Sequence, residues 1–138
     1  MTEGTSVALQ AGQEMTPLAV TITREQIKAY ADASGDQNPI HQDDTIAKQM
    51  GLPGVIAHGM LDFGILARAI TGWLGDPARL RRLRVRFSAM VQPGDVVTCR
   101  GVVESVDEAA GTAALSVWVE NQRGERVLNH GEATVSLP

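Results

Sequence analysis

The sequence predicts an α+β domain in which one long apolar helix packs against an antiparallel β-sheet. The first observation is a helical pattern over residues 59–74 that is apolar around most of its circumference, as in a helix buried by its surroundings. The second is a series of strand-like segments over residues 83–137, separated by short turns. A chain of 138 residues can form one hydrophobic core but not two, so we expect one domain over residues 1–138.

The composition argues against several classes of partner. The net charge is −4, from 12 Lys and Arg against 16 Asp and Glu, so we expect no general affinity for nucleic acid. The longest apolar segment, residues 55–74, contains Asp62 and Arg68, which favours a buried helix over a membrane span. Cys99 is the only cysteine and suits a reducing compartment, and the N-terminal residues lack the features of a secretory signal. These observations predict a cytoplasmic protein that does not bind membranes.

The N-terminal quarter predicts a strand followed by a helix. Residues 1–16 are weakly patterned and we expect them to be partly mobile, whereas the β-branched residues 18–22 suit a strand. Thr23 and Gln26 have the spacing of a capping box, so a helix should begin there. Gly35 can end that helix in the left-handed conformation.

Two further helices and the strands complete the prediction. Asp43 can cap a short helix over residues 44–50, and the long helix over 59–74 should end at Gly75. The expected strands, in order, cover residues 83–87, 96–106, 112–120 and 127–137. Four or five strands leave an open sheet edge and an incompletely covered helix, which favours dimerisation.

A short segment, residues 30–41, brings an acid close to an imidazole. Asp36 and His41 flank a turn whose backbone is restricted by Gly35, Asn38 and Pro39. A carboxylate and an imidazole held in one rigid turn can bind a water molecule and transfer its protons near neutral pH. The alternative is structural: Asp36 would bond to the turn backbone, and His41 would lie on the surface.

Gly59 stands at the start of the long helix and suggests an anion site. The first backbone N–H groups of a helix have no intrahelical acceptor, and the helix dipole adds positive potential there. A glycine lets a substrate oxygen approach these donors, which would stabilise an enolate. The alternative is that Gly59 only allows tight packing of the helix start.

Both segments resemble one known family. The run Tyr30-x-x-Ala33-Ser34-Gly35-Asp36-x-Asn38-Pro39-Ile40-His41, with Ala47 further on, is similar to the hydratase motif of MaoC-like dehydratases and (R)-specific enoyl-CoA hydratases. The run Ala57-His58-Gly59-Met60 stands where that family has its oxyanion-hole glycine. The chain looks most similar to the small HadB-type (3R)-hydroxyacyl dehydratase subunits, over about residues 21–138.

The resemblance implies a hotdog fold and a set of site residues. Asp36 and His41 would form the catalytic dyad, Asn38 would help to order the water and the dyad, and the N–H of Gly59 would bind the thioester carbonyl. The neighbours His58 and Met60 would lie at the substrate, although His58 is also suited to fixing the helix start by hydrogen bonding.

The implied activity is the reversible hydration of a trans-2-enoyl thioester to an (R)-3-hydroxyacyl thioester, without a metal or another cofactor. A second hotdog subunit, in a homodimer or a heterodimer, would help to shape the acyl tunnel. Ala67 stands where some short-chain hydratases carry a serine, so the acyl length stays open. The carrier, CoA or acyl carrier protein, and a bulky steroid-type acyl group also remain open.

Two other functions compete with hydration. Hotdog thioesterases often carry an acid on the long helix to activate water, and Asp62 could play that part, although a first-turn Asp also complements the helix dipole. The chain could instead serve mainly as a structural subunit of a hetero-oligomeric dehydratase.

One basic stripe offers a substrate contact. Strand alternation places Arg82, Arg84 and Arg86 on one face, which is either a solvated surface or a partner for CoA phosphates or an acidic carrier protein. Arg84 is our candidate contact. No pair of Cys or His residues has metal-ligand spacing and no Gly-rich nucleotide loop is present, so we expect neither a metal nor a nucleotide cofactor.

Overall fold

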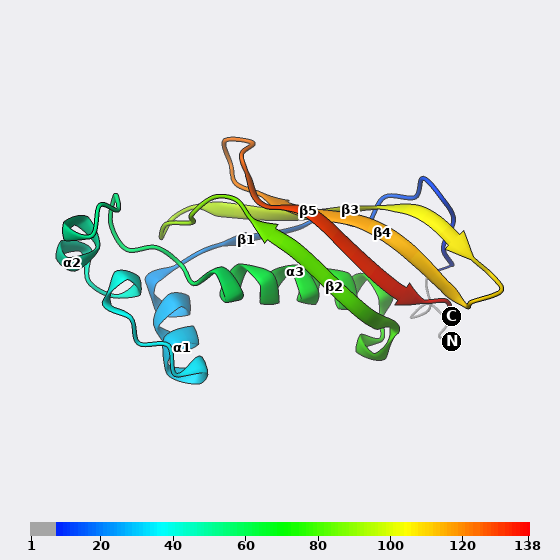
Figure 1. Ribbon diagram of the computed structural model, residues 1–138, viewed down its shortest axis with the longest axis horizontal. Helices are drawn as coiled ribbons and strands as arrows, with labels where there is room; N and C mark the ends of the chain where they lie inside the picture. The colour runs from blue at the N-terminus through cyan, green and yellow to red at the C-terminus, as the bar shows by residue number, and fades with distance from the viewer. Residues whose placement is uncertain (1–7) are drawn as a thin grey trace.

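The computed structural model describes residues 8–138 and confirms the α+β class. A five-stranded antiparallel sheet lies over one long helix, α3, which is the hotdog arrangement (Figure 1). The shorter helices α1 and α2 lie at one end of α3, and the C-terminus lies near the other end. In chain order the elements are β1 (Leu18–Thr21), α1 (Arg24–Ser34), the 3-10 turn η2 (Pro39–His41), α2 (Asp44–Gln49), α3 (Gly59–Leu74), the 3-10 turn η3 (Pro77–Arg79), β2 (Leu80–Phe87), β3 (Val96–Asp107), β4 (Thr112–Glu120) and β5 (Arg126–Ser136).

The sheet has the strand order β1-β3-β4-β5-β2, so β1 and β2 are its edges. The three long strands β3, β4 and β5 form a meander at the centre, and β2 returns to pair with β5. Residues 12–15 extend the β1 edge, because the N–H of Gly12 donates to Val103 and the N–H of Met15 donates to Gly101, each at 2.8 Å. Met15 is buried, so this part of the lead-in belongs to the sheet rather than being mobile as expected; residues 1–7 lie outside the described residues.

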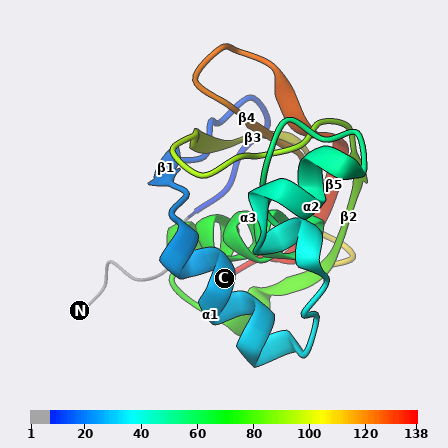
Figure 2. The same ribbon diagram turned by 90° about the vertical axis from the view of Figure 1, so that its left-hand side faces the viewer.

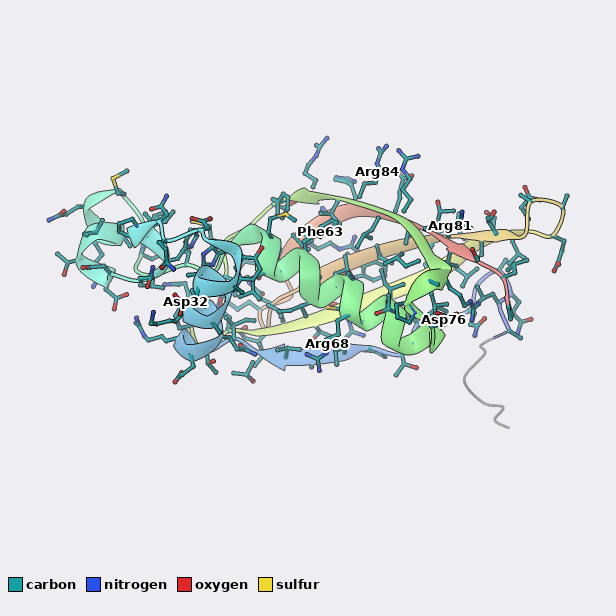
Figure 3. The ribbon with its side chains drawn as sticks, turned by 90° about the horizontal axis from the view of Figure 1, so that it is seen from below. Asp32, Phe63, Arg68, Asp76, Arg81 and Arg84 are labelled. Atoms are coloured by element: carbon teal, nitrogen blue, oxygen red, sulfur yellow. The ribbon has the colours of Figure 1, made fainter. Side chains whose placement is uncertain are left out.

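The core lies between the sheet and one face of α3. Leu66, Ile70 and Leu74 are fully buried against the strands. The opposite face of α3 is covered by no other element along most of its length, as Figure 3 shows from below. Gly64 and Arg68 are exposed on it, so the apolar circumference of this helix is buried on the sheet side only. Among residues 8–138, no helix is long and apolar enough to cross a bilayer.

Local signals in the sequence fix the segment that leads to α3. The side chain of Thr23 accepts from the N–H of Gln26 at 3.1 Å, and the Gln26 side chain accepts from the N–H of Thr23 at 2.9 Å, so the predicted capping box is present. Gly35 ends α1 with a φ of 81°, a left-handed conformation that glycine adopts without strain. Asp43 caps α2 as predicted. The turn between α1 and α2 therefore has a defined geometry set by its own residues.

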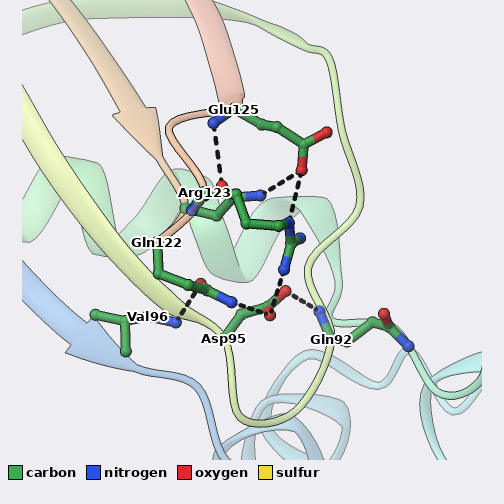
Figure 4. Close-up of polar contacts among 7 residues, drawn as sticks. Gln92, Asp95, Val96, Gln122, Arg123 and Glu125 are labelled. Carbon is green, nitrogen blue, oxygen red and sulfur yellow. Dashed lines mark hydrogen bonds and ion pairs between the residues drawn. The ribbon is translucent and has the colours of Figure 1, made fainter.

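A polar cluster joins two turns beside the start of α3 (Figure 4). Asp95 accepts a hydrogen bond from the N–H of Gln92 at Oδ2 and one from the Gln122 side chain at Oδ1, both at 2.9 Å, and Nη1 of Arg123 lies 3.7 Å from the same Oδ1. This cluster holds the turn that follows Val91, whose carbonyl accepts from the N–H of Ala57 at 2.7 Å. Ala57, just before α3, is thus bonded to the connection between β2 and β3 that the Asp95 cluster holds.

Gly131 is a position where the sheet tolerates no side chain. A Cβ on Gly131 would lie 2.2 Å from the backbone oxygen of Val117 on the neighbouring strand β4. Because backbone cannot rotate away, we expect Gly131→Ala to lower the free energy of unfolding by about 3 kcal/mol or more. Urea unfolding followed by circular dichroism would measure this.

Gly64→Ala is the matched control for that substitution. Nothing lies within 4 Å of a Cβ at Gly64, which is inside α3. Alanine should there leave stability unchanged or raise it by about 1 kcal/mol, because it favours the helix. Equal effects of the two substitutions would contradict the close approach of β4 and β5 at Gly131.

Candidate active site

A pocket of about 390 Å³ opens beside the start of α3. Figure 2 looks onto this end of the molecule, where α1 and α2 lie in front of α3. The residues that line the pocket come from α1, the following turn, the start of α3 and the end of β2: they are Tyr30, Ser34, Asp36, His41, His58, Gly59, Met60 and Phe87. The structure therefore brings together five of the residues that the sequence singled out, from two segments of the chain.

His41 is buried, and the environment of its ring sets its tautomer. Its Nδ1 lies 2.7 Å from the carbonyl oxygen of Ile56. A carbonyl oxygen only accepts, so Nδ1 carries the proton and a neutral ring has its lone pair on Nε2. That nitrogen is the one that lies on the side of Asp36. His41 is thus prepared to accept a proton at the pocket rather than lying on the surface.

Asp36 combines the structural and the chemical interpretations of its segment. Its Oδ1 accepts from the N–H of Asn38 at 3.3 Å, which is the expected turn. Its Oδ2 lies 4.0 Å from Nε2 of His41, and the side chain is half exposed. One oxygen therefore holds the turn while the other remains available at the pocket.

His58 connects the two segments of the site. Its Nε2 donates to the backbone carbonyl of Asp36 at 3.0 Å, and its ring stacks on that of His41 with centroids 3.7 Å apart and an angle of 21°. Tyr30 also packs against the His58 ring, with the two ring centroids 4.8 Å apart. His58 precedes α3 but makes no side-chain cap to it. Its hydrogen bond thus fixes the Asp36 turn to the helix start, and the side chain bonds to none of the backbone N–H groups of the first turn of α3.

Gly59 is the first residue of α3 and lines the pocket. Within residues 8–138, the N–H groups of Gly59 and Met60 donate to no other group, while those of Leu61 and Asp62 bond to the His58 carbonyl. A Cβ on Gly59 would lie 3.0 Å from the ring of Phe87. Both interpretations of this glycine therefore have a basis, because the helix start packs tightly and also presents free donors.

Two predicted site residues lie away from the pocket lining. Asn38 is exposed, and its Oδ1 accepts from the N–H of Ile40 at 3.2 Å, which caps the 3-10 turn that carries His41. Arg84 lies on the outer side of β2, 3.6 Å from Glu132, and Figure 3 shows its side chain pointing away from α3. Within this chain Asn38 acts on the turn, and Arg84 belongs to the opposite surface of the sheet.

Sequence reasoning did not name Ser34, Tyr30 or Phe87 as lining residues. Tyr30 and Ser34 are one helical turn apart on α1, so both face the pocket from the same side. The signal for Phe87 was the alternation of β2, which separates it from the exposed arginines. Phe87 is nevertheless 53% exposed, because it ends the strand and lies at the rim of the pocket.

The spacing rules for metals did not predict that Asp36, His41 and His58 offer ligand atoms within 4.8 Å of one another. Their geometry is poor for a single cation. The two imidazole rings are stacked nearly parallel, so their in-plane lone pairs do not converge on one point. In addition, one nitrogen of each ring is already bonded to a backbone carbonyl. The arrangement suits stacking and proton transfer better than metal coordination.

Asp62 faces the core rather than the pocket. It is 3% exposed, its Oδ1 has no hydrogen-bond partner within the described chain, and it is absent from the pocket lining. Burial raises the pKa of Asp62 to about 7. Burial and the proximity of Asp62 together raise the pKa of the Cys99 thiol on β3 to about 12. A thioesterase that uses Asp62 would need this carboxyl at the substrate, and the pocket does not provide it.

Comparison with known proteins identifies the family. The sequence profile of the MaoC-like domain matches residues 7–134. The chain belongs to the MaoC-like family. It is 37% identical over 109 residues to the fatty acid synthase subunit beta of Aspergillus oryzae, which covers 77% of this chain and 5% of that protein. It is also 31% identical over 132 residues to a probable enoyl-CoA hydratase 2 of Dictyostelium discoideum, covering 92% of this chain and 43% of that protein. The MaoC-like chain thus spans only a part of these relatives.

Solved structures of the family have the same fold. The (R)-hydratase from A. caviae, described as involved in PHA biosynthesis, superimposes with a TM-score of 0.86 at 28% identity, over 94% of this chain and 98% of that one. A chain of the ChsH1–ChsH2 complex from Mycobacterium tuberculosis matches with a TM-score of 0.79 at 25% identity, over 94% and 98% of the two chains. MaoC-like domains therefore include hydratases and members of heteromeric complexes.

The buried carboxyl of Asp62 makes stability depend on pH. Because its pKa is near 7 in the folded protein and near 3.8 when exposed, the folded state retains this proton over a range in which the unfolded state has lost it. Stability should thus fall as the pH rises from about 4 to about 7, by up to about 4 kcal/mol, and this contribution should be constant above that range.

We expect Asp62→Leu to abolish this contribution. The gain in unfolding free energy of the variant over the wild type should be small at about pH 4.5 and largest above about pH 7.5. Urea unfolding at several pH values measures it, and a difference independent of pH would contradict the raised pKa.

Proposed function

We propose that this MaoC-like protein is an (R)-specific enoyl-thioester hydratase that also runs the reverse dehydration of (3R)-hydroxyacyl thioesters. The observation that carries the proposal is the gap of 4.0 Å between Nε2 of His41 and Oδ2 of Asp36, at a pocket that also contains the free N–H of Gly59. Two proton acceptors and one oxyanion donor at a single small pocket suit addition of water next to a thioester carbonyl.

The gap is too wide for a direct hydrogen bond and matches a bridging water. Both facing atoms are acceptors, so such a water would donate one hydrogen to His41 and one to Asp36. Its oxygen lone pairs would then point into the pocket, towards the β-carbon of a bound enoyl group. The dyad would take one proton as the C–O bond forms and return a proton to the α-carbon. The proton-transfer roles are assigned to the dyad as a unit.

Gly59 would act on the other end of the reacting group. Addition at the β-carbon moves negative charge to the thioester oxygen, and a free N–H at a helix start stabilises that charge. Asn38 would act through the backbone, since it caps the turn that carries His41. His58 and Met60 would contact the substrate from the pocket wall beside Gly59.

The acyl group and its carrier are set by surfaces beyond the dyad. The exposed Met60 and Phe87 form an apolar rim that suits an acyl chain. The half-buried Ala67, on α3, adds no polar group that would favour a short chain. Arg84 would contact a CoA phosphate or an acidic carrier protein only where the substrate or a second subunit reaches the outer side of β2.

We further propose that the protein works in the cytoplasm as a homodimer, or as the catalytic member of a heterodimer with another hotdog subunit. The uncovered face of α3 and the open edge at β2 support this, because each presents surface that a second subunit can cover. A purely structural role in a hetero-oligomer would leave the dyad without a use.

The dyad gives the first direct test. Purified protein should hydrate crotonyl-CoA or longer enoyl-CoAs, seen as loss of absorbance of the conjugated thioester. Asp36→Asn and His41→Gln should each lower kcat at least about a hundredfold, since each replaces a group that can take up a proton by an amide that cannot. Glu108→Gln, in the exposed hairpin at the other end of the sheet, is the control and should be normal.

Near-normal rates in folded Asp36→Asn and His41→Gln proteins would overturn the mechanism. Release of free thiol from acyl-CoA without hydration would instead favour a thioesterase. Inactivity of the wild type alone, with activity restored by a partner subunit, would assign the protein to a heterodimer.

Gly59 offers a test of the oxyanion donor. Gly59→Pro removes the N–H, while proline is favoured at the first position of a helix and the extended His58 is compatible with it. Gly59→Ala adds a similar Cβ against Phe87 but keeps the donor. We expect Gly59→Pro to lower kcat about a hundredfold relative to Gly59→Ala. Equal kcat values for the two folded variants would show that the N–H plays no part.

A further inference from the structure

Two buried polar atoms at the start of α3 lack hydrogen-bond partners. Among the described residues, these are Nδ1 of His58 and Oδ1 of Asp62. Both side chains are 3% exposed, so bulk water does not satisfy them. They come from residues one helical turn apart, since the N–H of Asp62 bonds to the carbonyl of His58 at 3.4 Å. Buried groups of this kind are rare and call for an explanation.

The two atoms are complementary in their hydrogen bonding. Nε2 of His58 donates to the Asp36 carbonyl, so Nε2 carries the proton and Nδ1 of a neutral ring is an acceptor that needs a donor. Asp62 stands four residues after His58, at the spacing that places two side chains on one side of a helix, and a protonated carboxyl has one O–H to donate. Burial keeps this carboxyl protonated up to about neutral pH, because it raises the pKa to about 7.

We propose that Asp62, in its protonated form, donates to Nδ1 of His58 through one buried water molecule and thereby positions the catalytic dyad. A bridging water is needed because Nδ1 of His58 and Oδ1 of Asp62 make no direct hydrogen bond to each other. The proposal rests on the proposed hydratase function and assigns to it a residue outside the pocket.

The effect on the dyad follows from the tautomer of His58. A neutral imidazole carries one proton, and the hydrogen bond at one nitrogen determines where it resides. A donor at Nδ1 keeps the proton on Nε2, where it holds the Asp36 carbonyl while the ring supports His41 by stacking. A carboxylate at the same place would draw the proton to Nδ1 and weaken the bond to Asp36.

The other groups around this pair do not compete for the same role. Cys99 from β3 faces Asp62 but stays a neutral thiol, since its pKa is about 12. Arg68 lies on the exposed side of α3. His41 stacks on the His58 ring and Tyr30 packs against it at a tilt of 59°, and neither makes a hydrogen bond to Nδ1 of His58. Asp62 is thus a positioning residue that acts through His58.

Two substitutions separate this role from packing. Asp62→Asn retains a donor at every pH, whereas Asp62→Leu has no polar group. We expect Asp62→Leu to lower kcat about tenfold or more, with KM changed less than about threefold. This loss should occur although the same substitution raises the free energy of unfolding at neutral pH by removing a buried acid. Asp62→Asn should stay within about threefold of the wild type at pH 6.5 and keep its kcat at pH 8.5, where the wild type declines. Arg68→Leu, exposed on the next turn, should behave like the wild type.

Nitrogen-15 NMR of the three histidines reads the tautomer of His58 without any assay of activity. The His58 Nδ1 resonance should change as the pH passes about 7 in the wild type, and should not do so in Asp62→Asn. If the wild type proved inactive as a hydratase, the proposed function would fail while this measurement still tested the coupling. The proposal would be overturned if the His58 Nδ1 resonance of the wild type did not change as the pH passes about 7. Equal losses of kcat in Asp62→Asn and Asp62→Leu would also overturn it.

Discussion

The site depends on one hydrogen bond, from Nε2 of His58 to the backbone carbonyl of Asp36. It joins the turn that carries Asp36 and His41 to the start of the helix that begins at Gly59. A buried hydrogen bond contributes only about 1 kcal/mol net, but leaving one partner unbonded in the interior costs about 1–3 kcal/mol. The geometric effect is larger than the energetic one, because this bond sets the distance between the proton acceptors and Gly59.

The rest of the fold holds the helix start against which that bond acts. The buried face of α3 packs on the sheet, and Ala57, just before the helix, is bonded to Val91 in the connection between β2 and β3. The Asp95 cluster in turn fixes the turn after Val91 (Figure 4). The turn with Asp36 and His41, in contrast, buries few side chains of its own. A rigid helix start therefore positions a less supported turn, which suits a site that must admit substrate.

The elements that the sequence predicted well are those with local causes. The capping box at Thr23, the left-handed Gly35 and the cap at Asp43 depend on neighbours within a few residues. The contacts that define the site join distant parts of the chain: Ile56 with His41, His58 with Asp36, and Phe87 with Gly59. No pattern in a single segment specifies those pairs. The motif resemblance grouped the dyad with Gly59, and it did so without the geometry that relates them.

The apolar circumference of α3 explains why Asp62 was harder to place. A helix with apolar residues nearly all round has no preferred face, so the sequence left open whether Asp62 met the pocket, the solvent or the core. The sheet covers the side that contains Leu66 and Ile70, and Asp62 lies on that side. A buried, unbonded carboxyl lowers stability at neutral pH, and an apolar residue of similar size would avoid that loss. Sequences tolerate such local conflicts chiefly at functional sites, and this conflict lies within about one helical turn of both His58 and Gly59.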